Sequence, residues 1–318
     1  MHVFFHITNL SDIKSINFYV YFCIKEWTYR RKMDDTIKTG LVLEGGAMRG
    51  LFTAGVMDVM MENGIEFDGL IGVSAGSSFG CNYKSRQPGR VLRYNLKYAG
   101  DPRYMGLRSL VTSGNLVGAE FAYHILPLQL DIFDIPTFEQ NPMAFYLVAT
   151  DVADGQPVYY RMDKVNRQSL EWLRASASMP GVTRPVKVDD GRLMLDGGIS
   201  DSIPLAYFRS IGYMRNVVIL TQPRDYVKKP SSRWLWRMLM HRHKAIADAM
   251  SRRHEMYNSQ LRLVDEGIKR GDTFVIAPDR PLPIGRVSTN KAKMTHVYNI
   301  GRETAERTLP RLTEFLAR

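Results

Sequence analysis

The serine at position 74 stands in a pattern that suits a nucleophile. Gly72-Val73-Ser74-Ala75-Gly76 has the form G-x-S-x-G and follows an apolar run that we expect to be a buried strand. On a tight turn between a strand and a helix, the serine hydroxyl is exposed and the residues two positions away must be nearly free of side chain. The amide of Ala75 would lie at the helix N-terminus and could donate to an oxyanion. The pattern predicts a nucleophilic serine, and its alternative is an ordinary glycine-rich turn.

An earlier segment, from Gly45 to Gly50, could bind an anion because it too follows an apolar run and is rich in glycine. Successive amides in such a loop, here those of Gly45, Gly46 and Ala47, can hold an oxyanion or a phosphate. Nucleotide-binding loops occupy the same place, but the dinucleotide fingerprint fails at Ala47 and the Gly-Lys-Ser/Thr ending of a Walker loop is absent. The segment is consistent with an anion-binding loop that works with the serine turn.

A carboxylate, Asp196, ends a later apolar run and is followed by Gly197 and Gly198. Held at the end of a strand, it could take the proton of a serine directly. Taken alone, the segment is better explained as a plain turn, because Asp-Gly pairs are common in turns.

Together, in this order, the three segments resemble the patatin-like phospholipase family, in particular its bacterial YjjU-type branch. Residues 149–151 (ATD) and 175–181 (ASASMPG) support the resemblance, which covers about residues 39–223. The resemblance implies a serine acyl hydrolase that cleaves lipid acyl esters through an acyl-enzyme. It implies a dyad in which Ser74 is the nucleophile and Asp196 is the proton acceptor.

The resemblance also implies what surrounds this dyad. The amides of Gly45, Gly46 and Ala47 would form the oxyanion hole, and Arg49 with Gly50 would support the loop. No metal and no cofactor is implied. Ala47 departs from the pattern, because many family members have glycine there. Its amide would still serve, provided that the backbone angle φ at Ala47 is negative.

A Ser-His-Asp triad is the alternative to the dyad. In an α/β-hydrolase the histidine follows the acid, near the end of the core. Of the seven histidines, His296 is the only serious candidate, and we expect it not to be catalytic.

Asp151 with Asp154 could bind a cation or orient a loop, although such residues more often cap the exit of a strand. At the level of function, the alternative is a non-catalytic lipid- or nucleotide-binding protein that retains the fold.

Elements that would position these residues follow from the hydrophobic pattern. Strands alternating with helices predict an α/β fold with three layers, α/β/α, and a mainly parallel sheet. We expect helices and loops over residues 88–142 to shape the substrate cleft, and a helix over residues 51–61. The expected strands cover residues 41–43, 70–73, 145–149, 158–161, 193–195 and 217–220.

Three regions are predicted along the chain. Residues 1–32 are rich in Phe, Tyr and Ile without a clear period, and we interpret them as an extension ahead of a natural start at Met33. Residues 33–226 would be the catalytic domain. Residues 227–318 would be a smaller, basic, mostly helical region. In this last region we expect one or two helices over residues 233–268, a strand over 274–276 and a helix over 302–316.

The positive charge of the chain is unevenly placed. The formal net charge is +11, with +3 in residues 1–32, −2 in residues 33–226 and +10 in residues 227–318. This asymmetry suggests contact with an anionic membrane surface or nucleic acid, and its alternative is a solvated basic helical region. Nucleic acid is disfavoured, because no nucleic-acid-binding module is recognisable.

The segment 233–240 (RWLWRMLM) mixes aromatic and basic residues as interfacial helices do. Its alternative is a helix that packs Trp and Met onto the catalytic domain.

No apolar run is long enough to span a membrane, and no secretory signal is recognisable. Two cysteines make neither a disulfide framework nor a metal cluster. We expect a cytoplasmic protein whose substrate is a lipid ester and which can contact the inner membrane surface peripherally.

Overall fold

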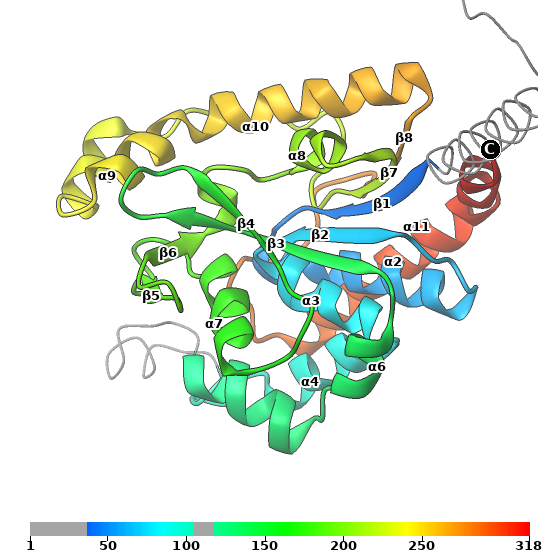
Figure 1. Cartoon of the computed structure of the whole chain (residues 1–318), viewed down its shortest axis with the longest axis horizontal. Coiled ribbons are helices and arrows are strands. Elements are labelled where there is room, and N and C mark those ends of the chain that lie inside the picture. The colour runs from blue at the N-terminus through cyan, green and yellow to red at the C-terminus, as the bar shows by residue number, and fades with distance from the viewer. Residues whose placement is uncertain (1–36, 105–117) are drawn as a thin grey trace, which may run out of the picture. The chain divides into compact units, whose positions relative to one another are not determined.

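A central sheet of eight strands lies between two groups of helices (Figure 1). The computed structural model describes residues 37–104 and 118–318, so the predicted extension over residues 1–32 and the start at Met33 lie outside the described residues. The strand order is β5-β6-β3-β2-β1-β7-β8, and β4 pairs with β3. The strands are β1 (Lys38–Leu43), β2 (Gly69–Val73), β3 (Ala144–Asp151), β4 (Pro157–Arg161), β5 (Val186–Lys187), β6 (Leu193–Asp196), β7 (Tyr213–Ile219) and β8 (Thr273–Ile276).

The centre of the sheet is parallel, as the alternation of strands and helices predicted. Strands β3, β2, β1, β7 and β8 are parallel neighbours. Strands β4 and β6 run antiparallel to β3, and β5 runs antiparallel to β6. The short strand β5 was not expected from the sequence. Because β6 returns beside β3, its last residue, Asp196, comes to the edge of the sheet where the parallel strands end.

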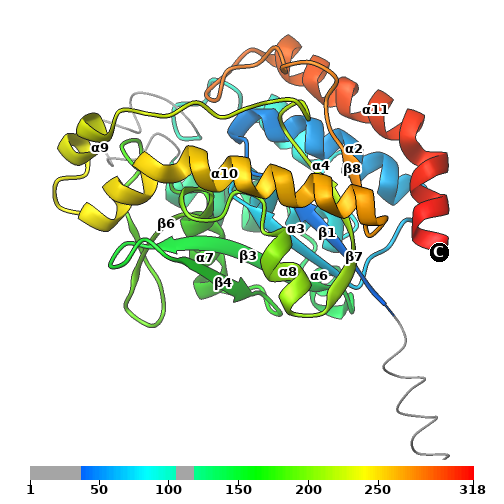
Figure 2. The same ribbon diagram turned by 90° about the horizontal axis from the view of Figure 1, so that it is seen from above.

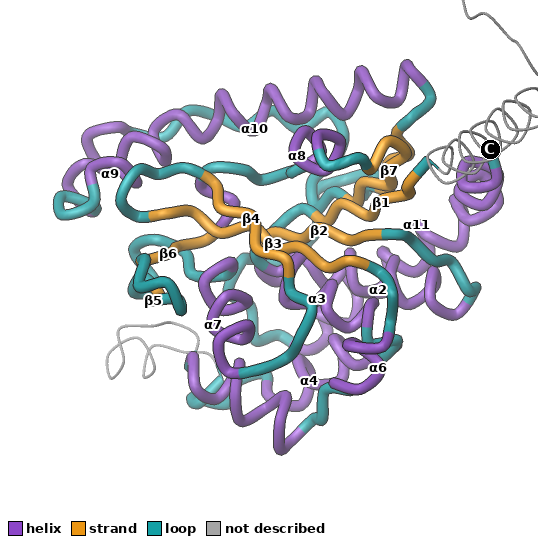
Figure 3. The backbone as a smooth tube through the Cα atoms, viewed as in Figure 1, coloured by secondary structure: helices purple, strands orange, loops and turns teal. Residues whose placement is uncertain are grey.

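Helices cover both faces of the sheet (Figure 3). Leu41 and Leu43 pack into the core beneath α2 (Gly50–Glu62), α3 (Ala75–Lys84), α7 (Arg167–Ser176) and α11 (Lys291–Ala317). Val42 points the other way, into the core beneath α8 (Leu205–Ser210) and α10 (Lys244–Arg270). Strands buried on both faces need apolar side chains at nearly every position. The structure is therefore the predicted three-layer α/β/α fold.

The basic region after residue 226 joins the same sheet, because β8 pairs with β7 through Val217 and Phe274. The boundary at 226/227 stays a prediction. Two helices cover the segment expected to hold one or two, namely α9 (Arg233–Leu239) and α10, which lies along the sheet (Figure 2). The terminal helix α11 begins at Lys291, well before the predicted Arg302. The side chain of Asn290 caps it by accepting a hydrogen bond from the Lys293 amide (3.0 Å).

Where it is described, the segment expected to shape the cleft consists of helices joined by turns and loops. It contains α4 (Arg90–Tyr98), the π-helix η2 (Phe121–Leu130) and α6 (Ile135–Gln140). Two short 3-10 turns, η1 (Ala47–Arg49) and η3 (Gly197–Ile199), follow β1 and β6. Within residues 37–104 and 118–318, none of the helices combines the length and the apolar character that a bilayer crossing requires.

Candidate active site

Ser74 occupies a strained turn between β2 and α3. Its backbone angles are φ 57° and ψ −121°, a conformation that residues with a side chain rarely adopt. The flanking glycines make the turn possible, because a Cβ on Gly76 would lie 2.5 Å from the Leu43 carbonyl oxygen and one on Gly72 would lie 2.6 Å from the Gly76 backbone. Gly76 thus lets the turn pack onto β1, and Gly72 lets β2 pack onto the start of α3. The sequence pattern thus produces a turn that presents Ser74 at the end of β2.

A second serine holds this turn in place. The Ser74 amide donates to Ser176 Oγ (3.1 Å), and Ser176 Oγ lies 2.9 Å from Ser77 Oγ. Ser176 ends α7 within the segment 175–181 that the family resemblance singled out. Its role as an anchor was not foreseen, since the sequence alone gives no sign that these two serines meet.

The glycine-rich loop after β1 lies directly against Ser74. A Cβ on Gly45 would stand 2.9 Å from Ser74 Cβ and 2.8 Å from the Val73 carbonyl oxygen. Within the described part of the chain, no acceptor takes the backbone N–H groups of Gly45, Gly46, Ala47 and Ala75. Four free donors therefore border the serine, as a site that stabilises an oxyanion requires.

Ala47 departs from the expectation for its backbone. We set a negative φ at Ala47 as the condition for a working loop. The structure does not meet this condition, because φ at Ala47 is +49°. The chain must turn sharply from Gly46 into η1, and the left-handed conformation makes that turn. Left-handed backbone costs a residue with a Cβ roughly 1–2 kcal/mol, which explains why glycine suits this position better. The Ala47 amide is nevertheless unpaired.

The pairing of strands brings Asp196 to Ser74. Val73 pairs with Val148 on one edge of β3, and Asp196 pairs with Ala149. Asp196 is 1% exposed. Its Oδ1 accepts from the Gly198 amide (2.8 Å), whereas Oδ2 is buried without a hydrogen-bond partner among the described residues.

The carboxyl of Asp196 has an altered acidity. Burial raises its pKa above the ordinary value, and the Ser74 side chain, Arg253 and the Gly198 amide lower it to a smaller extent. Ser74 is near enough to influence this pKa, yet no hydrogen bond of acceptable geometry joins the two side chains. Their contact is therefore looser than a closed hydrogen bond. A carboxylate with a raised pKa is a stronger base for the serine proton.

Glu44 fixes the start of the glycine-rich loop. It is 2% exposed, and its carboxyl accepts from the Thr221 amide (2.6 Å) and the Tyr257 hydroxyl (2.7 Å). Arg49 lines a cavity beside the loop, but its side chain has no hydrogen bond within the described residues. Its predicted role in supporting the loop stays a prediction. Gly50 packs against Ala75, where a Cβ would approach to 3.0 Å.

Two cavities of opposite character meet at Ser74. The larger, of about 450 Å³, is mostly apolar and extends between α3, α4, η2 and α7. The smaller, of about 50 Å³, is polar and contains both Ser74 and Asp196. The apolar lining includes Phe79, Tyr94, Leu126, Phe133, Leu170 and Leu173. Ser74 therefore lies where an apolar space and a polar space meet.

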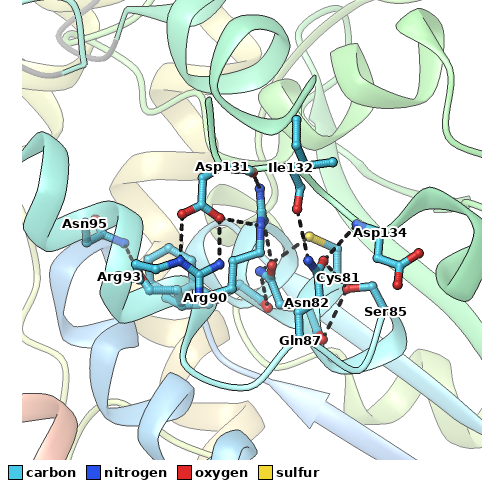
Figure 4. Close-up of polar contacts among 12 residues, drawn as sticks. Cys81, Asn82, Ser85, Gln87, Arg90, Arg93, Asn95, Asp131, Ile132 and Asp134 are labelled. Atoms are coloured by element: carbon cyan, nitrogen blue, oxygen red, sulfur yellow. Dashed lines mark hydrogen bonds and ion pairs between the residues drawn. The ribbon is translucent and has the colours of Figure 1, made fainter. Parts of the chain in front are cut away.

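A polar cluster borders the apolar cavity (Figure 4). Arg90 is 3% exposed and lines the cavity. Its guanidinium lies 3.1 Å from Asp131 and donates to Asn82 Oδ1 (2.7 Å). Arg93 pairs with the same Asp131 at 2.8 and 2.9 Å. Most of these groups have partners within the cluster, although Arg90 Nε makes no hydrogen bond, and together they form a polar boundary to the apolar space.

The remaining candidate residues take no part in this arrangement. His296 is exposed on α11, and no described histidine lines either cavity at Ser74. Asp151 accepts from the Ala153 amide (2.9 Å) and Asp154 from the Gln156 amide (2.9 Å), so both act in turns at the strand exit. Among the described residues, no group of acidic, histidine or cysteine side chains could hold a metal ion.

Helix α9 carries the mixed aromatic and basic segment, and none of its residues is buried. Trp234 is 71% exposed and Met238 is 50% exposed. Trp236 instead packs onto the protein and lines the larger cavity. The helix thus lies at the edge of that cavity, with some apolar side chains directed outward.

Three basic residues of the smaller cavity were missed by sequence analysis, namely Lys228, Arg253 and Arg286. They lie among nineteen basic residues of the segment 227–318, where no spacing distinguishes them. Their position depends on how α10 and the loop after β8 cross the end of the sheet.

Comparisons with known proteins cover both parts of the chain. The sequence model of a family described as patatin-like phospholipase matches residues 41–209, and one described as a domain of unknown function matches residues 236–317. The uncharacterized protein YjjU of Escherichia coli K12 is 29% identical over 283 residues, which cover 83% of this chain and 75% of that protein. Lysophospholipase nte1 of Aspergillus oryzae is 28% identical over 54% of this chain and 11% of that protein. The crystal structure of VipD from Legionella pneumophila has a TM-score of 0.46 and 12% identity, over 86% of this chain and 67% of that one.

Proposed function

The chain belongs to the patatin-like phospholipase family, and on that basis we propose that it hydrolyses lipid acyl esters with Ser74 as nucleophile and Asp196 as general base. Membership of the family supports a lipid hydrolase in general, as does the similarity to a lysophospholipase. The observation that supports the dyad most directly is the buried Oδ2 of Asp196, which has no partner among the described residues and lies in the same cavity as Ser74.

The proposed reaction has two halves. In the first, Asp196 takes the Ser74 proton as Oγ attacks the ester carbonyl, and the C=O becomes an oxyanion held by the loop amides. The carbon–oxygen bond to the alcohol then breaks, and Asp196 returns the proton to the leaving alkoxide. In the second half, Asp196 takes a proton from water, which attacks the acyl-enzyme. The free acid departs and Ser74 regains its proton.

Each surrounding feature has a part in this sequence. The free amides of Gly45, Gly46, Ala47 and Ala75 supply donors where negative charge develops. Burial of Asp196 raises its pKa and strengthens it as a base. The apolar cavity of about 450 Å³ would hold the acyl chain during both halves.

The proposal is tested by labelling with a fluorophosphonate, which reacts with activated serines whatever the natural substrate. We expect one adduct per chain by intact mass and its loss in Ser74→Ala. Hydrolysis of p-nitrophenyl butyrate should disappear in the same variant. A folded protein that takes no label and cleaves no ester would instead be the non-catalytic lipid- or nucleotide-binding protein.

A further inference from the structure

The small polar cavity beside Ser74 is lined by an excess of positive charge. Four basic side chains border it, namely Arg49, Lys228, Arg253 and Arg286. The last three come from the segment after residue 226. Within the described part of the chain, none of the four has a carboxylate oxygen within 4.0 Å. Several arginines outside this cavity have an acidic partner, as Arg209 has Asp272 and Arg302 has Glu62.

The two acidic residues of this cavity are already engaged. Glu44 accepts from the Thr221 amide and from the Tyr257 hydroxyl. Asp196 accepts from the Gly198 amide through Oδ1, and the proposed reaction requires its Oδ2 for the serine proton. Neither carboxyl forms an ion pair with any of the four cations within 4.0 Å, although Asp196 attracts Arg253 and Glu44 attracts Lys228 from farther away. Unpaired charge that is partly removed from water is costly, so the cavity is complementary to an anion.

Arg253 is held in place with part of its guanidinium unused. Its Nε donates to the Gly198 carbonyl oxygen, and Nη2 lies 3.5 Å from Ser202 Oγ. Nη1 makes no hydrogen bond or ion pair to the described residues. The guanidinium is thus fixed near Asp196, in the cavity that Ser74 also lines.

Lys228 is fixed by aromatic rings rather than by an acid. Its Nζ lies 4.3 Å from the ring centroid of Tyr257 and 5.8 Å from that of Tyr226. Burial lowers its pKa to about 8, and repulsion from Arg253, Arg286 and Arg49 contributes. An anion among these groups would remove the repulsion. Because no aromatic residue is among the described residues that line this cavity, a quaternary ammonium group has no aromatic surface to bind here.

From these contacts we propose that the cavity binds the phosphate of the alcohol part of the substrate. The preferred esters have a phosphate close to the scissile bond and no cationic group beyond it. This proposal rests on the proposed function, since it assigns the two sides of Ser74 to the two parts of one ester. The acyl chain occupies the apolar cavity, and the phosphate meets Lys228, Arg253 and Arg286 on the other side.

The test compares three substrates with the same oleoyl chain: 1-oleoyl lysophosphatidic acid, 1-oleoyl lysophosphatidylcholine and 1-oleoylglycerol. We expect kcat/KM to be highest for the phosphate monoester. Lys228→Gln and Arg286→Gln should each lower the ratio of kcat/KM for lysophosphatidic acid to that for oleoylglycerol by about 10- to 100-fold. Lys229→Gln is the matched control, because this exposed neighbour does not line the cavity, and its ratio should equal that of the parent.

Inorganic phosphate separates a general anion site from a headgroup site. It should inhibit hydrolysis of oleoylglycerol by the parent and do so more weakly in Lys228→Gln. If phosphate inhibits but lysophosphatidic acid is not preferred over oleoylglycerol, the headgroup assignment is wrong. Equal rates on all three esters, or equal losses on charged and neutral esters in both variants, also overturn it. In each of these cases, hydrolysis of oleoylglycerol shows that the proposed function itself stands.

Discussion

The hydroxyl of Tyr257 donates a hydrogen bond of 2.7 Å to the carboxyl of Glu44, although the two residues are 213 positions apart. Tyr257 belongs to α10, and Glu44 precedes the loop whose amides border Ser74. The same carboxyl also accepts from Thr221, at the end of β7. The helical region after residue 226 therefore helps to set the position of the glycine-rich loop that follows Glu44. It is more than a basic appendage to the catalytic part.

Removing this hydroxyl should weaken both the fold and the loop. In Tyr257→Phe the buried Glu44 carboxyl loses one donor, so we expect the free energy of unfolding to fall by about 1–3 kcal/mol. We also expect kcat for p-nitrophenyl butyrate to fall, since the loop loses an anchor. Denaturant titration and steady-state kinetics measure the two effects. Tyr226→Phe is the control, because Tyr226 packs against Tyr257 without contacting Glu44, and unchanged kcat in Tyr257→Phe would show that α10 does not set the loop.

The dyad predicts which side chains are indispensable. Ser74→Ala and Asp196→Asn should each lower kcat/KM for a soluble ester by at least about 10³-fold, as loss of a nucleophile or its base does in other serine hydrolases. Both proteins should remain folded by circular dichroism. His296→Ala should keep most of the activity, because this residue is exposed on α11 away from both cavities. A loss in His296→Ala as large as in Ser74→Ala would favour a triad instead.

The strain at Ala47 can be relieved or increased. At φ +49° glycine avoids a cost of roughly 1–2 kcal/mol, which exceeds its own entropic cost of roughly 0.4–1 kcal/mol, so Ala47→Gly should be slightly more stable than the parent. Ala47→Val should displace the loop and lower kcat by about 10²-fold, the effect of losing one oxyanion donor. Thermal melts and kinetics on p-nitrophenyl butyrate test the pair. Full activity in Ala47→Val would mean that this amide does not contact the oxyanion.

Much of this arrangement could be predicted from local sequence, because each of its three central segments carries its own turn chemistry. Ser74, Asp196 and the Gly45 loop follow apolar runs that became β2, β6 and β1. The sign of φ at Ala47 was missed, since it depends on where the loop must go next. Lys228 and the other cations of the small cavity were missed for another reason. Their meeting with Ser74 depends on helix packing across the end of the sheet, which no spacing in the sequence reveals.

Asp201 predicts a pH dependence of stability. It is 6% exposed, accepts from Tyr159 and Gln260, and burial raises its pKa to about 6. A carboxyl whose pKa is raised on folding makes its full contribution to the stability of the folded protein at a pH below its ordinary pKa of 3.8. This contribution is lost as the pH rises through about 6. Asp201→Asn does not titrate. Its free energy of unfolding relative to the parent should therefore rise by about 2–3 kcal/mol between pH 4 and pH 7.

A carboxyl shifted the other way provides the control for this experiment. Arg192 lowers the pKa of the exposed Asp190, so Asp190→Asn should not gain stability relative to the parent over the same pH range. Denaturant titrations at pH 4, 5.5 and 7 cover the transition. A constant difference between Asp201→Asn and the parent would show that Asp201 ionises as readily in the folded chain as in the unfolded one.

Helix α9 leads to a prediction about how the protein meets its substrate. Long-chain esters reside in bilayers or micelles, so the proposed function requires that the cavity open toward such a surface. Trp236 lines the larger cavity, while Trp234 and Met238 of the same helix are exposed beside it. Arg233 and Arg237 share Asp248 at 3.5 and 3.6 Å, which leaves an excess of positive charge on the helix. We propose that α9 is the membrane-contacting element and that the Trp234 side chain lies at headgroup depth.

The expected consequence is binding that depends on lipid charge and on salt. Basic side chains near an anionic surface contribute about 1 kcal/mol each, and added salt screens this attraction. Binding to phosphatidylglycerol vesicles should exceed binding to phosphatidylcholine vesicles and should fall as NaCl rises. Replacing Arg233, Arg237 and Arg242 by Glu should lower hydrolysis of vesicle lipid much more than hydrolysis of p-nitrophenyl butyrate, and Trp234→Ala should act in the same direction.

A second triple variant, far from α9, separates a local effect from an effect of net charge. The C-terminal ends of α10 and α11 lie far from α9 in both views of the ribbon. They carry the exposed residues Lys269, Arg311 and Arg318. Replacing them by Glu changes the net charge by the same amount. If α9 is the contact, this control should hydrolyse vesicle lipid faster than the α9 variant does. Equal losses in the two triple variants would mean that overall charge alone draws the protein to lipid. Equal losses on vesicle lipid and soluble ester in the α9 variant would mean that α9 merely supports the cavity.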